Sequence, residues 1–475
     1  MAGFVVARKG IKCLKNFEAP LIRKDLFEKD ITQKIMQFLS DMKIRTNTSS
    51  FRIFRTSSRG CLGVEHGDYH GLPVAGVPLG LIHPDGQVGG TLVFMWAASE
   101  GRDVKVASLN QIEKYGNNAK TADFSLDKYA SPEAVKSDKH YPWTKFVQGA
   151  VWVIQKHLKE EKGVGLQHGI VGALSGDLPE GGLSSSAALS INLILALLEA
   201  NNVKGITMRE VTLWAKELEN DYVGANCGIL DQTMIGFGKP NALTVLRDQK
   251  SGEIEYVSMP EDTKPFSMFI FDTGKARPEG GLQNSTYFYR SGKDRTEIIN
   301  FANELNLKID NVGQLNADGF EQLINGLWKQ GKGKDGTYSY HLANQVQYLR
   351  DANMNFNKLL SAWKTGDVKA IGDILYSDGQ GLAGKFVISS PMQIIADAVA
   401  MGVPGVAGIR MAGGGDGGAN IGIFIENDTI TFEEARNMML VTYGHYVKLN
   451  SIELNSEPKI YQATTSIHGV AEIKD

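Results

Sequence analysis

The sequence predicts a protein of the α+β class with two domains, and three observations support this prediction. The chain has 475 residues, which is more than one ordinary hydrophobic core accommodates. From the segment FRIFRTSSRG onward, runs typical of strands alternate with runs typical of helices. The composition changes after the segment GKPNALTVLRD, and the segment EDTKPF that follows fits a hinge. The boundaries that we expect are an extension over residues 1–45, an N-terminal domain over residues 46–260 and a C-terminal domain over residues 261–475.

Signals for helices and strands follow one another through the first half of the chain. Ile31, Ile35 and Phe38 lie at helical spacing, which predicts that the extension forms an exposed helix. The runs TLVFMW, VKVAS and GIVGAL suit strands, and WTKFVQGAVWVIQKHL suits a helix. Another helix begins after Thr207, because Glu210 three residues later completes a capping box. The residues that we expect on its buried face are Val211, Trp214, Ala215, Leu218 and Tyr222.

The second half of the chain continues the same mixed pattern. The run SMFIFDTG predicts a strand, and a long helix is predicted from about Tyr338 to Trp363. A further helix is marked by Ser390 as its cap, Pro391 in its first turn and Gly402 at its end. The segment GVAGIRMAGGGDGGANIGIFIE then predicts a strand, a Gly-rich loop and a second strand.

Composition and charge exclude several classes of protein. Apolar residues make up 42% of the chain and charged residues 22%, which is ordinary for a globular protein. A net charge of -3, spread over both halves, offers no basic face to nucleic acid. The three widely spaced cysteines, Cys13, Cys61 and Cys227, argue against a disulfide framework and a zinc site and indicate a reducing compartment. No run reaches the roughly 18 apolar residues of a membrane span.

The first residues bear on the location of the protein. The segment MAGFVVARKGIKCLKNF carries cations, but its apolar run is too short for a secretory signal. It has no acidic residue before Glu18, so a transit peptide for an organelle remains an alternative. We expect a cytoplasmic protein, and the sequence leaves its oligomeric state open.

The segment LPEGGLSSSAALS, residues 178–190, places three serines at the start of an apolar helix. The first N–H groups of a helix have no partner within it and the helix dipole is positive there, so phosphate binds favourably. Gly182 permits close approach of the backbone, and Ser184 to Ser186 can donate N–H and hydroxyl groups, one hydroxyl reaching a magnesium ion. An ordinary serine cap is the alternative, although it needs only one serine. The lysine of a Walker P-loop is absent.

A second segment, SSRGCLGVEHGDYHG at residues 57–71, gathers polar groups among glycines. Arg59, Glu65, His66 and Asp68 lie within ten residues, and the glycines allow tight turns that bring them together. Carboxylates beside an imidazole suit a polyhydroxylated ligand, because each oxygen accepts a hydroxyl hydrogen. A polar surface loop is the simpler interpretation of this segment alone.

Two acidic residues lie in the segment ELENDYVGANCGILDQTMIGFGKP. Asp231 is flanked by apolar residues, where a carboxylate is buried only with a partner, and such acids are candidates for catalysis. A helix-capping aspartate is the alternative. Glu219 lies at the edge of the buried face of its helix, where it faces an ion or solvent.

Together with the loop GGGDGG, these motifs in this order resemble the GHMP kinase superfamily and, within it, the galactokinase family. The galactokinase pattern GRVNLIGEHTDYNG is similar to residues 59–71, and GLSSSAAL is identical to residues 182–189. The pattern CGIMDQ is similar to residues 227–232, and GSRMTGGGFGG is similar to residues 408–418. Weaker similarities lie in YPWTKFVQG and NSTYFYRSGKDR, so the resemblance covers about residues 50–450.

The resemblance implies an N-terminal domain of ribosomal-S5-like fold and a C-terminal ferredoxin-like domain, with Mg-ATP and a sugar bound between them. It implies transfer of the γ-phosphoryl group of ATP to the anomeric hydroxyl of galactose or a close relative. Asp231 would take the hydroxyl proton or orient the attacking oxygen, and Arg59 would pair with it. The resemblance assigns Mg²⁺ to Ser186 and Glu219; the sugar to Glu65, His66, Asp68, Gly228 and Tyr287; and the nucleotide to Gly181, Gly182, Leu183, Ser184, Ser185, Ser186, Ala187 and, by stacking on adenine, Trp143.

Departures from the family pattern leave alternatives open. TSSRGCLG replaces APGRVNLIG, Asp416 stands where an aromatic residue is usual, SSPMQII lacks the acidic CPELD pattern, and loops are lengthened after Gly71 and around Gly333. The sugar could therefore be L-arabinose, N-acetylgalactosamine or a uronic acid. A regulatory sensor that binds galactose and ATP without turnover is another alternative, although the intact SSSAA favours an enzyme. Trp143 could equally be a core aromatic of its helix.

Overall fold

The structure is a computed structural model that describes residues 21–23, 29–41, 51–83, 86–138, 142–177, 181–277, 285–330 and 340–474. Strands occur throughout this part of the chain. In chain order they are β1 (Leu21–Arg23), β2 (Arg52–Gly63), β3 (Val74–Ile82), β4 (Val88–Gly89), β5 (Thr91–Ala98), β6 (Asp103–Ser108), β7 (Ala122–Ser125), β8 (Ile170–Gly176), β9 (Ala242–Leu246), β10 (Ile254–Ser258), β11 (Phe266–Asp272), β12 (Val406–Met411), β13 (Ala419–Ile425), β14 (Lys459–Thr464) and β15 (Val470–Lys474).

Helices alternate with these strands along the chain. The α-helices are α1 (Lys29–Asp41), α2 (Leu109–Tyr115), α3 (Pro132–Ser137), α4 (Lys145–Lys162), α5 (Ser185–Ala200), α6 (Met208–Glu217), α7 (Leu230–Phe237), α8 (Thr286–Tyr289), α9 (Arg295–Glu304), α10 (Ala317–Gln330), α11 (Tyr340–Thr365), α12 (Val368–Gly381), α13 (Pro391–Met401) and α14 (Phe432–Leu449). Short 3₁₀ or π turns near the site are η3 (Asp68–His70), η5 (Leu218–Val223), η7 (Arg290–Asp294) and η9 (Leu382–Phe386). Among the described helices, none combines the length and apolar character needed to cross a membrane.

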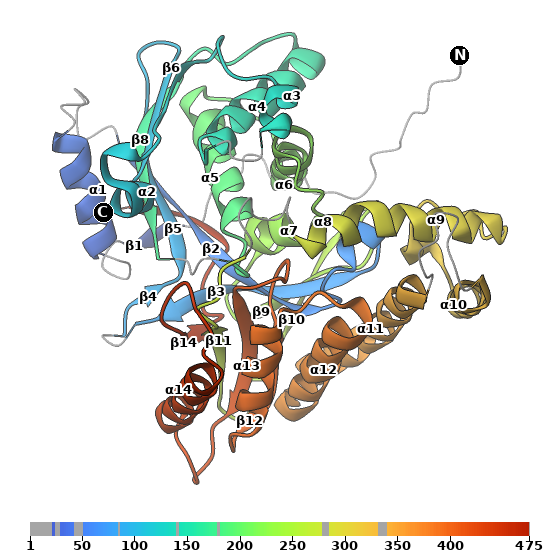
Figure 1. Ribbon diagram of the computed structural model, residues 1–475. Coiled ribbons are helices and arrows are strands. Elements are labelled where there is room, and N and C mark those ends of the chain that lie inside the picture. The colour runs from blue at the N-terminus through green and yellow to red at the C-terminus, as the bar shows by residue number, and fades with distance from the viewer. Residues whose placement is uncertain are drawn as a thin grey trace.

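The strands pair in the order β12-β13-β11-β14-β3-β2-β5-β8-β6-β7, mostly antiparallel, with β6 and β8 parallel. In the view of Figure 1, α4, α5 and α6 lie above the long strands β2 and β3, and α11 to α14 lie below them. Strands that pair largely antiparallel and helices that cover them in groups define the α+β class. The predicted class is confirmed.

Strand β5 shows why a continuous apolar run forms a strand in this protein. Leu92, Phe94 and Trp96 belong to the core that includes α4 and α5, whereas Val93 and Met95 belong to the core that includes α1. Successive side chains of a strand point to opposite faces of the sheet. Helices cover both faces, so neither face needs polar residues.

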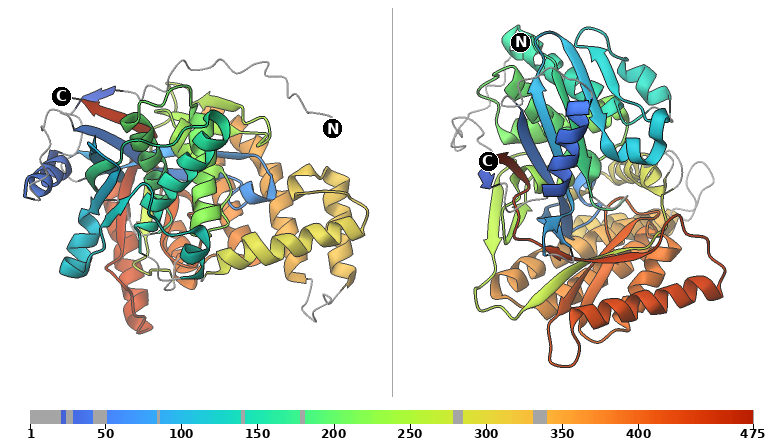
Figure 2. Two further views of the ribbon diagram at one scale, coloured as in Figure 1. Left: turned by 90° about the horizontal axis from the view of Figure 1, so that it is seen from above. Right: turned by 90° about the vertical axis from the view of Figure 1, so that its left-hand side faces the viewer.

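Helix α1 forms where the sequence predicts a helix, but the expectation that it is exposed is wrong. Ile35 is 0% exposed and Leu39 is 4% exposed, because α1 packs against β5 and β8. The right-hand view of Figure 2 shows this helix lying along the face of those strands. Leu21–Arg23 forms β1, which pairs with β15. The rest of the predicted extension, residues 1–20, 24–28 and 42–45, lies outside the described residues.

The carboxyl-terminal strand β15 returns to the strands of the first half of the chain. It pairs antiparallel with the first half of β2, from Ile53 to Thr56. Arg52 at the start of β2 donates hydrogen bonds to the Glu472 carboxylate of β15 over 3.0 Å and 2.8 Å. The predicted domain boundary at residue 260 stays a prediction. Strand β15 belongs to the predicted C-terminal domain but pairs with β2 of the predicted N-terminal domain.

The capping signals read from the sequence are confirmed in the structure. Thr207 and Glu210 form the capping box of α6, and the buried residues Val211, Trp214 and Ala215 follow it. Ser390 caps α13, which has Pro391 in its first turn and Gly402 after its end. The other two residues predicted for the buried face of α6, Leu218 and Tyr222, are buried on η5. The long helix predicted from Tyr338 is α11, and residues 338 and 339 lie outside the described residues.

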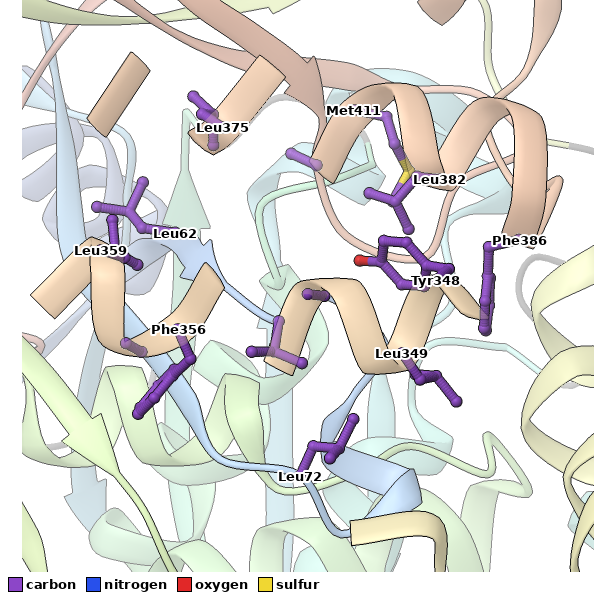
Figure 3. Packing of buried hydrophobic residues seen from close by; sticks show 14 of the residues in the cluster. Leu62, Leu72, Tyr348, Leu349, Phe356, Leu359, Leu375, Leu382, Phe386 and Met411 are labelled. Atoms are coloured by element: carbon purple, nitrogen blue, oxygen red, sulfur yellow. The ribbon is translucent and has the colours of Figure 1, made fainter. Parts of the chain in front are cut away.

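A large apolar cluster connects β2 with the helices of the second half. Figure 3 shows Tyr348 and Leu349 of α11 near Leu382 and Phe386 of η9, and all four are buried. The Tyr348 hydroxyl donates a 2.9 Å hydrogen bond to the carbonyl of Glu65, which follows β2. This cluster therefore holds the segment after β2, which carries several candidate site residues.

The packing of α1 yields a prediction about stability. Ile35→Ala should lower the free energy of unfolding by about 2–5 kcal/mol, because it leaves a cavity between α1 and the sheet. Met36→Ala is the matched control, since Met36 is 42% exposed on the same helix. Chemical and thermal unfolding of both variants provide the measurement. Equal free energies of unfolding of the two variants would contradict the prediction that the packing of Ile35 against the sheet stabilises the protein.

Candidate active site

Arg59 and Asp231 form an ion pair. Arg59 lies on β2 with a side chain that is 2% exposed, and Asp231 lies in the first turn of α7. Arg59 Nε donates to Asp231 Oδ1 over 2.6 Å, and Arg59 Nη1 donates to the carbonyl of Gly182 over 2.7 Å. The predicted pairing is confirmed, and the capping alternative is not, because Ile229 occupies the cap position. The Asp231 side chain is 30% exposed rather than buried, so its carboxylate is accessible to a ligand.

The serine loop has an unusual backbone. Gly182 has a φ of 91° and Ser184 a φ of 62°, in the left-handed region that a serine rarely adopts. Ser184 stands at the cap position of α5, but its side chain accepts no capping hydrogen bond. The buried Ser184 Oγ has no hydrogen-bond partner among the described residues. The serine-cap alternative therefore fails, and the loop offers a buried hydroxyl beside the start of a helix, as an anion site requires.

The Gly-rich loop between β12 and β13 packs directly on the serine loop. A Cβ atom added to Gly413 would lie 2.8 Å from Gly182 Cα, and one added to Gly418 would lie 3.0 Å from the Gly181 carbonyl carbon. Arg277 Nε donates a 3.0 Å hydrogen bond to the carbonyl of Gly415 in this loop. Two glycine-rich segments that are far apart in the sequence thus meet backbone to backbone.

Ser186 and Glu219, the predicted Mg²⁺ ligands, are brought together by α5 and η5. The Ser186 hydroxyl hydrogen-bonds the Glu219 carboxylate, and Gln232 Nε2 donates to Glu219 Oε1 over 2.8 Å. Burial raises the pKa of Glu219 to about 7, although these two hydrogen bonds oppose the shift. A hydroxyl and a buried carboxylate are oxygen ligands of the kind Mg²⁺ prefers. Among the described residues, no cluster of three or more His, Cys, Asp or Glu could hold a metal ion.

Asp68 and Gly228, two of the predicted sugar residues, lie against each other. A Cβ atom on Gly228 would lie 2.1 Å from Asp68 Oδ2, so only glycine fits beside this carboxylate. Asp68 Oδ2 accepts a 3.0 Å hydrogen bond from the N–H of Leu230, the first residue of α7. Burial raises the pKa of Asp68 to about 6, and the bond from Leu230 opposes the shift. Asp68 therefore fixes the start of the helix that carries Asp231.

Glu65, His66 and Tyr287, the other predicted sugar residues, lie close together and are almost fully buried. Glu65 Oε2 is 3.5 Å from Arg410 Nη2. The His66 ring stacks on Phe386 at 5.3 Å and lies 5.6 Å from the ring of Tyr287. Burial and then the Arg410 charge lower the pKa of His66 to about 3, so its imidazole is neutral near pH 7. Contact between these residues and a sugar stays a prediction.

Trp143 lies two residues before the start of α4. Its indole Nε1 donates a 2.7 Å hydrogen bond to the carbonyl of Lys120, and its ring packs against the core around α4 and α5. The ring is half-buried. Stacking on adenine stays a prediction.

Sequence reasoning missed two arginines near the site. Arg410 on β12 is fully buried and donates a 2.8 Å hydrogen bond to the Cys61 carbonyl beside its contact with Glu65. Arg277 lies beside the serine loop, with Cζ 4.0 Å from the position of a Cβ on Gly181. For Arg410 a signal was present, because a lone charge within the apolar run GVAGIRMAG suggests a buried partner, as it did for Asp231.

Comparison with known proteins places this geometry in a family. Residues 145–239 match the sequence profile of the GHMP kinases N terminal domain. The galactokinase of Thermococcus kodakarensis is 30% identical over 297 residues, which cover 62% of this chain and 75% of that protein. The galactokinase of Lacticaseibacillus casei is 28% identical over 309 residues, or 62% and 73% of the two chains. That of Bacillus subtilis is 24% identical over 375 residues, or 78% and 89%.

Solved structures share the fold. The crystal structure of Lactococcus lactis galactokinase complexed with galactose matches 93% of this chain and 98% of its own, with a TM-score of 0.72 and 22% identity. The Methanococcus jannaschii mevalonate kinase matches 87% and 97%, with a TM-score of 0.52 and 15% identity. The expected architecture is therefore that of the GHMP kinases. By sequence and by fold, this chain belongs to the galactokinase family of the GHMP kinase superfamily.

Proposed function

We propose that the protein is an ATP-dependent galactose kinase that transfers the γ-phosphoryl group of Mg-ATP to the anomeric hydroxyl of galactose. The observation that carries this proposal is the position of Arg59, which bonds both the partly exposed Asp231 carboxylate and the Gly182 carbonyl of the serine loop. A group that accepts a hydroxyl proton is thereby held next to a loop suited to phosphate, as phosphoryl transfer to an alcohol requires. Family membership supports the same reaction.

In this proposal Asp231 accepts the proton of the sugar hydroxyl or orients its oxygen for attack. Arg59 holds the carboxylate in place through their ion pair and contributes positive charge near the transferring phosphoryl group. The N–H groups at the start of α5 and the Ser184 hydroxyl would hold phosphate oxygens. Ser186 and Glu219 would hold Mg²⁺, which neutralises phosphate charge when it is bound.

The sugar side of the proposed site depends on Asp68 and its neighbours. Asp68 belongs to the polar segment after β2 and accepts the N–H of Leu230 at the start of α7, and in this proposal its carboxylate would also accept a hydrogen bond from a ring hydroxyl. Glu65, His66 and Tyr287, which are almost fully buried, would supply the other contacts to the sugar. Because His66 is neutral near pH 7, these three residues would offer the sugar a carboxyl group, an uncharged imidazole and a phenolic hydroxyl.

A cytoplasmic location belongs to the same proposal. Cys61 is free and buried, and Cys227 is free and lies beside Gln232. Free thiols close to an active site fit a reducing compartment.

The proposal is tested by release of ADP from Mg-ATP in the presence of galactose. Turnover that depends on galactose is the expected result. Absence of turnover with galactose and with a panel that includes L-arabinose, N-acetylgalactosamine and galacturonate would contradict the proposal and favour a binding sensor.

Replacement of Asp231 by asparagine tests the proposed base. Asp231→Asn should lower kcat by about 10² to 10⁴-fold, the range for loss of a general base, with an unchanged melting temperature. The control is Asp262→Asn, because Asp262 is exposed in the predicted hinge. More than a tenth of the wild-type kcat in Asp231→Asn would reduce Asp231 to a structural partner of Arg59.

Replacement of Ser186 by alanine tests the proposed ion site. Ser186→Ala should weaken the use of Mg-ATP more than the binding of galactose, because it removes one oxygen ligand while Glu219 remains. Steady-state kinetics at rising Mg²⁺ concentration provide the measurement. Added Mg²⁺ should partly restore Ser186→Ala but leave Asp231→Asn unchanged. An identical response of both variants would contradict this division of roles.

The choice of sugar is tested with galactose and galacturonate. The resemblance assigns Glu65 and His66 to the C6 end of the sugar, where a carboxylate would face Glu65. The imidazole there is neutral, and Arg410 is already engaged by Glu65 and the Cys61 carbonyl. Juxtaposed like charges cost several kcal/mol, so kcat/KM should favour galactose by about a hundredfold or more. The two sugars are compared at equal pH and ionic strength. A ratio near one would show that the C6 end of the pocket differs from the assigned arrangement.

A further inference from the structure

Asp416 departs from the family pattern, and its side chain has a specific partner. It lies in the Gly-rich loop with a φ of 57°, a left-handed conformation that aspartate adopts more readily than bulky residues. Its carboxylate accepts a hydrogen bond from the backbone N–H of Thr286, the first residue of α8. Its own N–H donates over 3.0 Å to the carbonyl of Ile388. Asp416 therefore joins the Gly-rich loop to the start of α8.

The first turn of α8 carries Tyr287, on the proposed sugar side. The Tyr287 ring lies 5.6 Å from the ring of His66 and 5.7 Å from that of Tyr69. Its hydroxyl donates a weak 3.4 Å hydrogen bond to the carbonyl of Asn226, just before the segment that contains Gly228. Because Tyr287 directly follows Thr286, the bond to Asp416 limits how far this ring can move from its neighbours.

The same loop also reaches the phosphate side of the site. Arg277 donates to the carbonyl of Gly415, next to Asp416, and its guanidinium lies beside Gly181 of the serine loop. Asp416 and Arg277 carry opposite charges that interact across this short distance. Gly415 thus holds Arg277 on the proposed phosphate side, and the adjacent Asp416 holds the start of α8 on the proposed sugar side.

We propose that Asp416 is a positioning residue that fixes the first turn of α8, and with it Tyr287, against the sugar pocket. This role rests on the proposed galactose kinase function. A charged carboxylate makes a stronger hydrogen bond than a neutral acceptor, and its loss in a shielded setting is costly. An aromatic residue, which is usual at this position in the family pattern, has no carboxylate to accept the Thr286 N–H.

Three variants separate the parts of this device. Asp416→Ala removes the acceptor and the charge, whereas Asp416→Asn keeps an acceptor oxygen and removes the charge. Thr286→Pro keeps the carboxylate and removes the donor N–H, together with the threonine hydroxyl. Proline is accepted at the first position of a helix, and the preceding Ser285 has the extended backbone that proline requires (φ -103°, ψ 165°). Asp428→Ala is the matched control, because Asp428 is exposed in the loop before α14.

The expected result is a rise in the KM for galactose of about tenfold or more in Asp416→Ala and Thr286→Pro, with a smaller change in kcat. Asp416→Asn should show a smaller rise than either. Asp416→Ala and Thr286→Pro break the same hydrogen bond. The variant that combines them should therefore have a KM for galactose no higher than that of the more affected single variant. A KM for galactose within twofold of wild type in Asp416→Ala, or additive effects in the double variant, would overturn the proposal.

Hydrogen exchange of the segment 285–290, measured without substrates, separates this proposal from the proposed function. Exchange should be faster in Asp416→Ala than in wild type and unchanged in Asp428→Ala. If wild-type protein does not phosphorylate galactose, the proposed function fails, and exchange still decides whether Asp416 holds α8. Unchanged exchange in Asp416→Ala would overturn the positioning role, and if that variant does not fold, Thr286→Pro decides by the same measurement.

Discussion

A buried arginine is the constraint on which the candidate site depends. Arg59 lies on β2 with almost no exposed surface, and a cation buried without partners is costly in free energy. Its guanidinium therefore requires the Asp231 carboxylate from α7 and the Gly182 carbonyl from the loop before α5. Burial opposes the charged form, yet Asp231 and then Glu65 hold the pKa of Arg59 above its usual value. The need to neutralise one cation thus locates the proposed base and the phosphate loop together.

The fold was predictable from the sequence where its determinants are local. The capping box of Thr207 and Glu210 lies within four residues, so it marks the start of α6 without knowledge of the rest of the chain. The burial of α1 was not predictable in this way. Ile35 is covered by Met95 and its neighbours on a sheet face, and nothing within α1 indicates that such a face is available. Period and caps reveal an element, whereas its packing partner depends on contacts distant in sequence.

In the candidate site, too, local motifs were predictable from the sequence and contacts between distant segments were not. The residues of the motifs were found, because their spacing resembles a family, and the structure brings Arg59 to Asp231 and Ser186 to Glu219. The fit of Gly228 against Asp68 could not be read from either segment, since it depends on how the two loops meet. Arg277 was missed for a related reason, and the apolar run around Arg410 signals a buried partner without identifying it. The partners that show where these arginines lie are Gly415 for Arg277 and Glu65 for Arg410, and each partner is more than a hundred residues away in the sequence.

The pairing of β15 with β2 has a consequence for the folding of the protein during its synthesis. Arg52 and Glu472, which these strands join, are 420 positions apart in the chain. A ribosome adds about 5–20 residues per second, so the first half of β2 waits roughly 20 to 80 seconds for its partner. During that interval the nascent chain presents an unpaired strand edge, beside Phe54 and Ile53 on its two apolar faces, to any other nascent chain nearby. Closure of this edge by β15 is possible only after almost all of the described chain has been synthesised.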